Sequence, residues 1–215
     1  MVTLPTPQAV VFDIGNVLIE WNPERFYDSL LGSEGRQRLF AEVDLHGMNA
    51  AVDAGALFRE TVEATAAANP GWSDAILCWY HRWIDMASPR IAPSITLMRR
   101  LRGKGVPVFA LTNFGVDSFA YAQTQYDFLS EFDHAYVSGR MGVIKPDPAI
   151  YAMVEVHSGL PPERLLFVDD KADNIAAALA RGWQAHLFDG PPGWADRLVA
   201  AGLLTAEEAR ACPPC

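Results

Sequence analysis

Five short apolar runs divide the chain, and each of them ends in polar residues or glycine. They cover residues 9–12, 106–111, 134–137, 165–168 and 184–188. Continuous apolar runs of this length are typical of strands that are buried on both faces of a parallel sheet. The hydrophobic pattern therefore predicts a parallel sheet of about five strands.

Helical patterns lie between these runs, at residues 94–102, 117–126, 148–157 and 174–181. In the first of them, apolar residues recur every three to four positions and Gly103 follows, as expected at a helix end. Strands that alternate with helices indicate an α/β fold with right-handed crossovers. We expect a Rossmann-like core.

One long segment interrupts the alternation between the first and second strands. It contains four stretches of helical character, at residues 23–31, 34–42, 54–68 and 73–87, and no convincing strand. The simplest interpretation is a four-helix cap inserted after the first strand. We therefore predict two domains: a core of residues 1–19 and 90–215, and a cap of residues 20–89.

Polar side chains follow the predicted strands, where the sites of open α/β sheets form. They are Asp13 after the first strand, Thr112 and Asn113 after the second, Lys145 downstream of the third, and Asp169 and Asp170 after the fourth. Three carboxylates crowded together raise each other's pKa unless a cation compensates. Because all of these ligands are oxygens, the sequence favours Mg²⁺.

The remaining groups suit phosphoryl transfer. Lys145 adds a positive charge, Thr112 a hydroxyl donor and Asn113 a backbone N–H, which together can hold phosphoryl oxygens in the transition state. Asp13 then fits a carboxylate nucleophile that forms an aspartyl-phosphate.

This set of motifs resembles the haloacid dehalogenase superfamily of phosphohydrolases. The resemblance rests on residues 10–18, 111–113, 145–146 and 167–174, which occur in the family's order and each beside a predicted strand. It implies that Asp13 is nucleophile and metal ligand, and that Gly15 offers its carbonyl to the metal. It also implies that Asp170 binds Mg²⁺ directly, and Asp169 directly or through water. The inserted helices resemble the family's first-type cap, which closes over the site and selects substrate.

One position departs from the family's pattern. Most family phosphatases carry a second aspartate two residues after the nucleophile, as general acid and then base, and here that position is Gly15. General acid–base catalysis contributes about 10²–10⁴-fold, so the loss matters. Either the leaving group needs little protonation, another residue or a water supplies the proton, or turnover is lost.

Two cap residues are candidates for substrate contacts, His46 and Asn49. The titration range of histidine also suits His46 to the role of the substitute acid. The alternative interpretation of His46 is a solvated loop histidine.

The amino-acid composition limits the classes of partner that the protein is expected to bind. There are 17 Lys and Arg against 26 Asp and Glu, a formal net charge of −9, which argues against binding to nucleic acid or to an anionic membrane. With no signal-peptide pattern and only three cysteines, we expect a cytoplasmic protein. We expect a monomer or homodimer, and an unstructured tail carrying Cys212 and Cys215.

The expected function is a Mg²⁺-dependent phosphatase of small phosphorylated metabolites, of which sugar phosphates are one class. Two alternatives stay open. One is a non-catalytic phosphate-binding homologue, which Gly15 would permit. The other is a 2-haloacid dehalogenase, whose departing halide needs no proton; such enzymes resemble this sequence less, because they use no metal and carry an aromatic residue where Gly15 stands.

Overall fold

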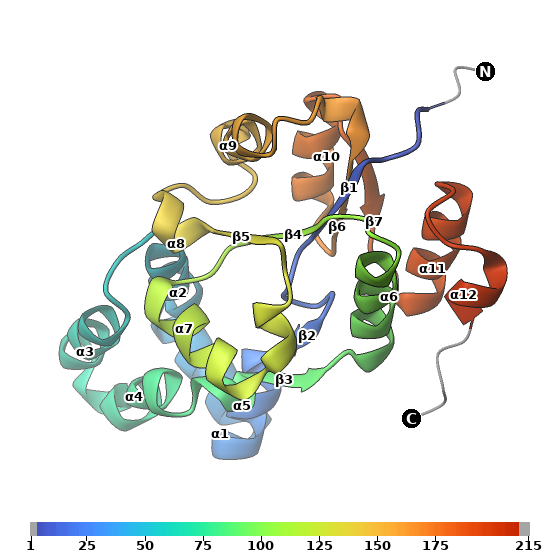
Figure 1. The fold of residues 1–215 in the computed structure, drawn as a ribbon. Coiled ribbons are helices and arrows are strands. Elements are labelled where there is room, and N and C mark those ends of the chain that lie inside the picture. The colour runs from blue at the N-terminus through green and yellow to red at the C-terminus, as the bar shows by residue number, and fades with distance from the viewer. Residues whose placement is uncertain (1–3, 211–215) are drawn as a thin grey trace.

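The computed structural model describes residues 4–210, and all five predicted strands form one parallel sheet (Figure 1). Its strands are β1 (Ala9–Phe12), β4 (Val108–Thr112), β5 (His134–Val137), β6 (Leu165–Asp169) and β7 (Gln184–Leu187). The order across the sheet is β5-β4-β1-β6-β7. The predicted α/β fold is therefore confirmed.

Strand β1 occupies the centre of the sheet and is fully buried. Val11 pairs in parallel with Phe109 of β4 on one side and with Phe167 of β6 on the other. The order of the strands reverses at β1, because the chain continues to β4 and β5 in one direction and to β6 and β7 in the other. Ligand sites of open α/β sheets form at such a reversal.

Helices cover both faces of the sheet. They are α6 (Ala92–Gly103), α7 (Val116–Gln125), α9 (Pro148–Ser158), α10 (Ala172–Ala180) and α11 (Pro191–Ala200). Since successive strand residues point to opposite faces, β1 divides its side chains between two cores. Val11 packs in a cluster with Ile150 of α9, whereas Val10 and Phe12 pack in a larger one that includes Trp194 of α11. Both faces are thereby closed to water.

A helical insertion, residues 23–86, lies in the chain between the first and second strands of the parallel sheet (Figure 1). Its helices are α1 (Pro23–Glu42), α2 (Leu45–Asp53), α3 (Phe58–Ala68), α4 (Ser73–His81) and α5 (Trp83–Met86), with the short 3₁₀ turn η1 (Pro70–Trp72). The first two helices expected from the sequence are the two halves of α1. Gly32, with φ of +73°, breaks α1 between them.

Helix α2 was not predicted, since none of the four expected helical stretches covers residues 45–53. Asp44 caps it by accepting a hydrogen bond from the Gly47 N–H at 2.8 Å. The helix has nine residues and contains a glycine near its start, so its local signal is weak. Buried Leu45, Met48 and Val52 pack its inner side into the core. Tertiary packing therefore stabilises a helix that the local pattern did not indicate.

The expectation of no strand between the first and second sheet strands was wrong. Strands β2 (Ile19–Trp21) and β3 (Ala87–Arg90) form an antiparallel ribbon where the chain enters and leaves the helical insertion. Ile19 pairs with Arg90, and Trp21 pairs with Ala87. Strands of three and four residues are too short for alternation to be recognised in the sequence.

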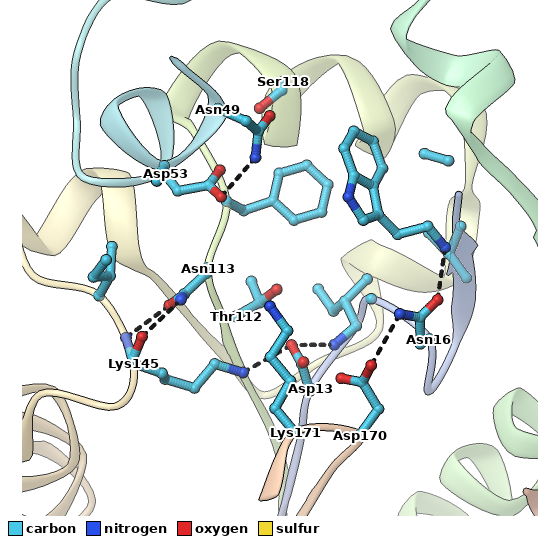
Figure 2. A pocket seen from close by; sticks show the side chains of 18 of the residues that line it. Asp13, Asn16, Asn49, Asp53, Thr112, Asn113, Ser118, Lys145, Asp170 and Lys171 are labelled. Atoms are coloured by element: carbon cyan, nitrogen blue, oxygen red, sulfur yellow. Dashed lines mark hydrogen bonds and ion pairs between the residues drawn. The ribbon is translucent and has the colours of Figure 1, made fainter. Parts of the chain in front are cut away.

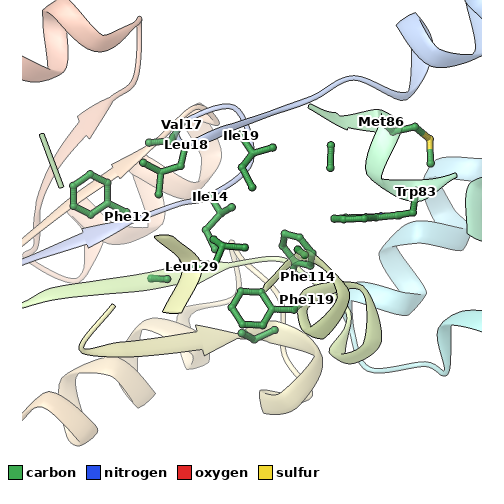
Figure 3. Close-up of a cluster of buried hydrophobic side chains, with 14 of the residues drawn as sticks. Phe12, Ile14, Val17, Leu18, Ile19, Trp83, Met86, Phe114, Phe119 and Leu129 are labelled. Carbon is green, nitrogen blue, oxygen red and sulfur yellow. The ribbon is translucent and has the colours of Figure 1, made fainter. Parts of the chain in front are cut away.

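An aromatic contact joins the helical insertion to the sheet. Figure 3 shows Trp83 of α5 beside Phe114, which follows β4, and Phe119 of α7. The ring centroids of Trp83 and Phe114 are 5.2 Å apart, and those of Phe114 and Phe119 are 5.5 Å apart. All three side chains belong to the larger apolar core. The insertion and the sheet therefore share one hydrophobic cluster.

The other short elements are η2 (Asp127–Ser130), α8 (Ser138–Met141), η3 (Pro162–Arg164) and α12 (Ala206–Arg210). Within residues 4–210, no helix has the length and apolarity needed to cross a bilayer. The predicted tail with Cys212 and Cys215 lies outside the described residues.

Candidate functional site

The carboxyl ends of the central strands bring the predicted residues together (Figure 2). Asp13 follows β1, Thr112 ends β4 and Asp169 ends β6, so the parallel order places Asp13 between the other two. Lys145 reaches the same point from the loop before α9. A cavity of about 360 Å³ opens there. Eight of the nine residues predicted for the site line this cavity. The ninth, Asp169, is fully buried.

Lys145 is the buried cation of the site. Its Nζ lies 2.9 Å from Oδ1 of Asp13 and 2.7 Å from Oδ2 of Asp169, and donates to the Leu111 carbonyl at 2.8 Å. Burial alone would lower the pKa of Lys145, but the two carboxylates outweigh it and raise that pKa. Lys145 therefore stays charged, and the three acceptors fix its position.

Asp13 shares this buried environment. Burial raises the pKa of Asp13 to about 7, against the lowering effect of Lys145, and the carboxylates of Asp169 and Asp170 push in the same direction as burial. A single lysine therefore does not compensate three neighbouring acids. A divalent cation would favour the ionised form of all three.

The three carboxylates are close enough to share such a cation. Asp13, Asp169 and Asp170 each offer an oxygen, and these oxygens lie within 4.8 Å of one another. An all-oxygen set suits Mg²⁺. Asp13 and Asp170 line the cavity, whereas Asp169 is fully buried. The donor chemistry at the site therefore fits a hard divalent cation.

Asparagine side chains position two of these acids. The Asn174 amide donates to both oxygens of Asp169 at 2.9 Å, and the Lys171 N–H donates to the same carboxylate at 2.8 Å. On the other side, the Asn16 amide donates to Asp170 at 2.9 Å. Asn16 itself adopts a left-handed φ of +55°, and its side-chain oxygen accepts from the backbone N–H of Trp21. No role for Asn16 was predicted from the sequence.

Asn113 is tied to the Lys145 loop. Its amide donates to the Lys145 carbonyl at 2.9 Å, and the Lys145 N–H donates to its Oδ1 at 2.8 Å. Both polar ends of the side chain are thus engaged within the protein. The backbone N–H of Asn113, which was predicted to bind phosphate, takes no part in these two hydrogen bonds.

Gly15 leaves open space at the position where the family's second aspartate is expected. It lines the cavity, and a Cβ added there would meet only the Cβ of Trp21, at 4.0 Å. Packing therefore does not require a glycine at this position. The missing carboxyl group is a difference in chemistry rather than a steric necessity.

His46 and Asn49 both line the cavity from α2. His46 is largely exposed, and its Nε2 lies 3.3 Å from a carboxylate oxygen of Glu24. Asn49 accepts a hydrogen bond from the Trp79 indole at 3.2 Å and donates to Asp53 at 2.9 Å. His46 thus lies at the solvent side of the cavity, and Asn49 deeper inside it.

Asp53, which was not predicted from the sequence, lines the same cavity from the end of α2. Positions 46, 49 and 53 are spaced by three and four residues, which places them on one side of a helix. That spacing would have indicated Asp53 if α2 had been predicted. Lys171 was missed as well, although it follows the two acids of the fourth motif directly and lines the cavity.

Aromatic and aliphatic side chains form the wall of the cavity away from the acids. They are Ile19, Trp21, Trp79, Trp83, Phe114 and Ile144. The Trp21 ring centroid lies 5.9 Å from that of Trp79 and 5.7 Å from that of Trp83. The cavity therefore has a charged end at the sheet and an apolar end under the helical insertion.

These features define an α/β protein with an acidic site, whose oxygen donors fit a divalent cation, at the reversal point of a parallel sheet. The chain belongs to the haloacid dehalogenase-like hydrolase family, whose model matches residues 7–182. It is therefore a hydrolase, as the resemblance predicted.

Among curated proteins, the chain is similar to the sesquiterpene phosphatase astK of Aspergillus oryzae. The two are 27% identical over 206 residues, which are 86% of this chain and 91% of that protein. An (S)-2-haloacid dehalogenase of Pseudomonas fluorescens is 29% identical over 109 residues, 51% of this chain and 48% of that protein.

Among solved structures, the HAD family enzyme bt-2542 of Bacteroides thetaiotaomicron has been determined in complex with magnesium and inorganic phosphate. It matches with a TM-score of 0.68 and 22% identity, over 86% of this chain and 95% of that one. The L-2-haloacid dehalogenase of Xanthobacter autotrophicus matches with a TM-score of 0.59 and 18% identity, over 94% and 86%. Both share the fold.

Proposed function

We propose that the chain is a Mg²⁺-dependent phosphatase that hydrolyses small phosphate monoesters through an aspartyl-phosphate on Asp13. The observation that carries this proposal is the group of three carboxylates at the charged end of the cavity, two of which are paired with Lys145. A dehalogenase would need no cation and gains nothing from such a group. The magnesium and phosphate bound by bt-2542 and the activity of astK support the same choice.

Each residue of the charged end has a role in this reaction. The Asp13 carboxylate attacks phosphorus, and Lys145 holds both the nucleophile and a phosphoryl oxygen. The Thr112 hydroxyl and the Asn113 backbone N–H bind the remaining phosphoryl oxygens. Asp13, the Gly15 carbonyl, Asp169 and Asp170 would hold Mg²⁺. The bound ion supplies charge neutralisation at the phosphoryl group.

The helical insertion is proposed to act as the cap of this enzyme, with residues 20–89 as its extent. It supplies the apolar wall, together with His46 and Asn49, for the part of the substrate beyond the phosphate. Sugar phosphates are one candidate class, since sugars bind by stacking and by hydrogen bonds to such residues. Phosphates of apolar alcohols are the other, because Trp21, Trp79 and Trp83 present mainly apolar surface.

The experiment is phosphate release from a panel that contains both classes of ester and an aryl phosphate. We expect turnover with Mg²⁺ and none with a chelator, and Asp13→Asn should abolish it. Well-folded protein that releases no phosphate from any ester would favour the non-catalytic phosphate-binding alternative. Chloride release from 2-chloropropionate in the presence of chelator would identify a dehalogenase instead.

A further inference from the structure

The side chain of Asp53 lies across the cavity from Asp13, at the end of α2 (Figure 2). Asn49 donates to its carboxylate at 2.9 Å. The buried Ser138 hydroxyl donates to the Asp53 carbonyl at 2.6 Å and accepts from the Phe114 N–H at 2.8 Å. Both the backbone and the carboxyl group of Asp53 are therefore held in place.

Asp53 has no partner of opposite charge within ion-pair distance among the described residues, although it lies in the cavity. Among residues 4–210, the carboxyl groups that line the cavity are those of Asp13, Asp53 and Asp170. Asp13 and Asp170 belong to the cation and nucleophile cluster. Asp53 is thus the carboxyl group that the proposed mechanism leaves unused.

The direction of attack places the leaving oxygen on the side of Asp53. In phosphoryl transfer the attacking and leaving oxygens are roughly in line with phosphorus. Asp13 approaches from the sheet, so the leaving oxygen points away from the sheet, toward the helical insertion. Asp53 and Asn49 lie on that side of the cavity (Figure 2). The position two residues after the nucleophile, Gly15, offers no proton there.

The environment of Asp53 suits a proton donor near neutral pH. Burial raises the pKa of Asp53 to about 7, while Lys171, the Gly115 N–H and Lys145 act to lower it. Besides these two lysines, the titratable side chains that line the cavity are Asp13, Asp170 and His46. A catalytic acid is most effective when its pKa lies near the operating pH.

We propose, on the basis of the phosphatase function above, that Asp53 is the general acid and base that replaces the carboxyl group missing at Gly15. In the first step an Asp13 oxygen bonds to phosphorus, the bond from phosphorus to the ester oxygen breaks, and that oxygen takes the proton of the Asp53 carboxyl group. The alcohol leaves, with Asp53 ionised and Asp13 phosphorylated.

In the second step Asp53 removes a proton from the attacking water. The water oxygen bonds to phosphorus, the bond from phosphorus to the Asp13 oxygen breaks, and inorganic phosphate forms. Asp13 is again a carboxylate and Asp53 again carries its proton. The two steps together consume one water and need no further reactant.

The test compares two esters of similar size, 2-phenylethyl phosphate and 4-nitrophenyl phosphate, with Mg²⁺. The leaving group of the first ester is an alkoxide, which needs a proton. The leaving group of the second is a stabilised phenolate, which does not. Asp53→Asn should lower kcat/KM for the alkyl ester by about 10²–10⁴-fold. For the aryl ester the loss in kcat/KM should stay below about tenfold, since the first step needs no acid. Because the second step needs Asp53 as the base, Asp53→Asn should stall after phosphorylation of Asp13. It should therefore release nitrophenolate in a burst of one molecule per enzyme molecule.

The matched control is Asp44→Asn, the same chemical change on the same helix. Asp44 lies outside the cavity lining, and asparagine caps helices as well as aspartate does. It should change neither rate. His46→Gln tests the other candidate acid, and the ratio of the alkyl to the aryl kcat/KM should be retained in it. An altered ratio in His46→Gln but not in Asp53→Asn would overturn the proposal.

A wild-type measurement keeps the proposal testable even if Asp53→Asn folds poorly. The kcat/KM ratio of alkyl to aryl ester should fall as pH rises above 7, because the acid is lost. Since the nitrophenyl ester ionises at lower pH than the alkyl ester, each kcat/KM is first corrected to the dianion with the measured phosphate pKa of that ester, and the ratio is taken from the corrected values. A ratio that is constant from pH 6 to 9, or equal losses for both esters in folded Asp53→Asn, would refute the role of Asp53 while leaving the phosphatase intact. A wild-type enzyme that hydrolyses neither of these esters nor any other ester of the panel would refute both.

Discussion

The side chain of Asn113 and the backbone of Lys145 bind each other twice, through one donated and one accepted hydrogen bond. The pairing joins the loop after β4 to the loop that carries the buried lysine. It places the Lys145 ammonium between Asp13 and Asp169 without using the ammonium itself. The position of the charge is thus set by neutral groups 32 residues away in the chain.

Replacing Asn113 should therefore act on both stability and activity. Asn113→Ala removes two partly buried hydrogen bonds, each with a net contribution of about 1 kcal/mol, so the free energy of unfolding should fall by about 1–3 kcal/mol. The proposed phosphatase activity should fall too, since the lysine loop loosens. Urea denaturation and phosphate release measure the two effects. Full activity in Asn113→Ala would show that the loop is held by other contacts.

The buried ion cluster predicts a large effect of Lys145. Lys145→Met leaves Asp13 and Asp169 buried without a counterion, and breaking a buried pair in this way costs about 3–5 kcal/mol. The double variant Lys145→Met with Asp169→Asn removes one of the stranded charges and should recover part of the loss. Urea unfolding in chelator measures both. A double variant less stable than Lys145→Met would contradict the interpretation that stranded charge causes the loss.

Divalent cation should stabilise the fold through the three carboxylates. At a Mg²⁺ concentration one hundred times its Kd, binding to the folded state adds about 2.7 kcal/mol, which appears as a rise in Tm. Asp170→Asn removes a cavity-facing ligand and should weaken the rise. Asp173→Asn, an exposed acid three residues along, should retain it. An equal rise in all three proteins would point to non-specific ion effects.

Stability without metal should depend on pH through Asp53. Its pKa is about 7 in the folded chain against an ordinary 3.8, so the folded state binds more protons than the unfolded state between those values. Stability should therefore fall as pH rises from about 4 to 7, by at most about 1.4 kcal/mol per pH unit for this group. Asp53→Asn should flatten part of that slope in urea titrations with chelator. An unchanged slope would place the titration elsewhere.

A carboxyl group can be restored at the position that lacks one. Gly15→Asp adds a side chain where the nearest atom to its Cβ is 4.0 Å away, so the variant should fold. In the Asp53→Asn background it should recover part of the alkyl phosphate hydrolysis, since a proton donor again lines the cavity. The measurement is the alkyl to aryl ratio of kcat/KM, with Gly15→Asn as the control that has the same shape and no acid.

The sheet could be predicted because its signal is local. The runs at β1 and β5 were identified with their observed ends, since strands buried on both faces are continuously apolar. The short ribbon of β2 and β3 could not be predicted in the same way. Its pairing brings Trp21 next to Ala87 from the far end of the helical insertion, a contact that no local pattern records.

The residues of the candidate site fall into the same two groups, those with a local sequence signal and those without one. Asp13, Thr112 and Asp169 could be predicted, because each ends or follows a recognisable strand. Asp53 could not, because its significance depends on α2, a helix whose start is stabilised by the Asp44 cap and whose inner side is stabilised by burial. Asn16 was missed for a related reason, since its left-handed backbone is fixed by contacts with Asp170 and Trp21.

The α/β class and the set of acids and lysine at the strand ends follow from the sequence alone, because apolar continuity and residue type are local properties. The position of Lys145 between Asp13 and Asp169, and that of Asp53 across the cavity from them, are visible only in the folded chain. Those relationships depend on the order of the strands and on how the helical insertion packs over the sheet. The physical reason is that burial and charge compensation arise between segments far apart in the chain.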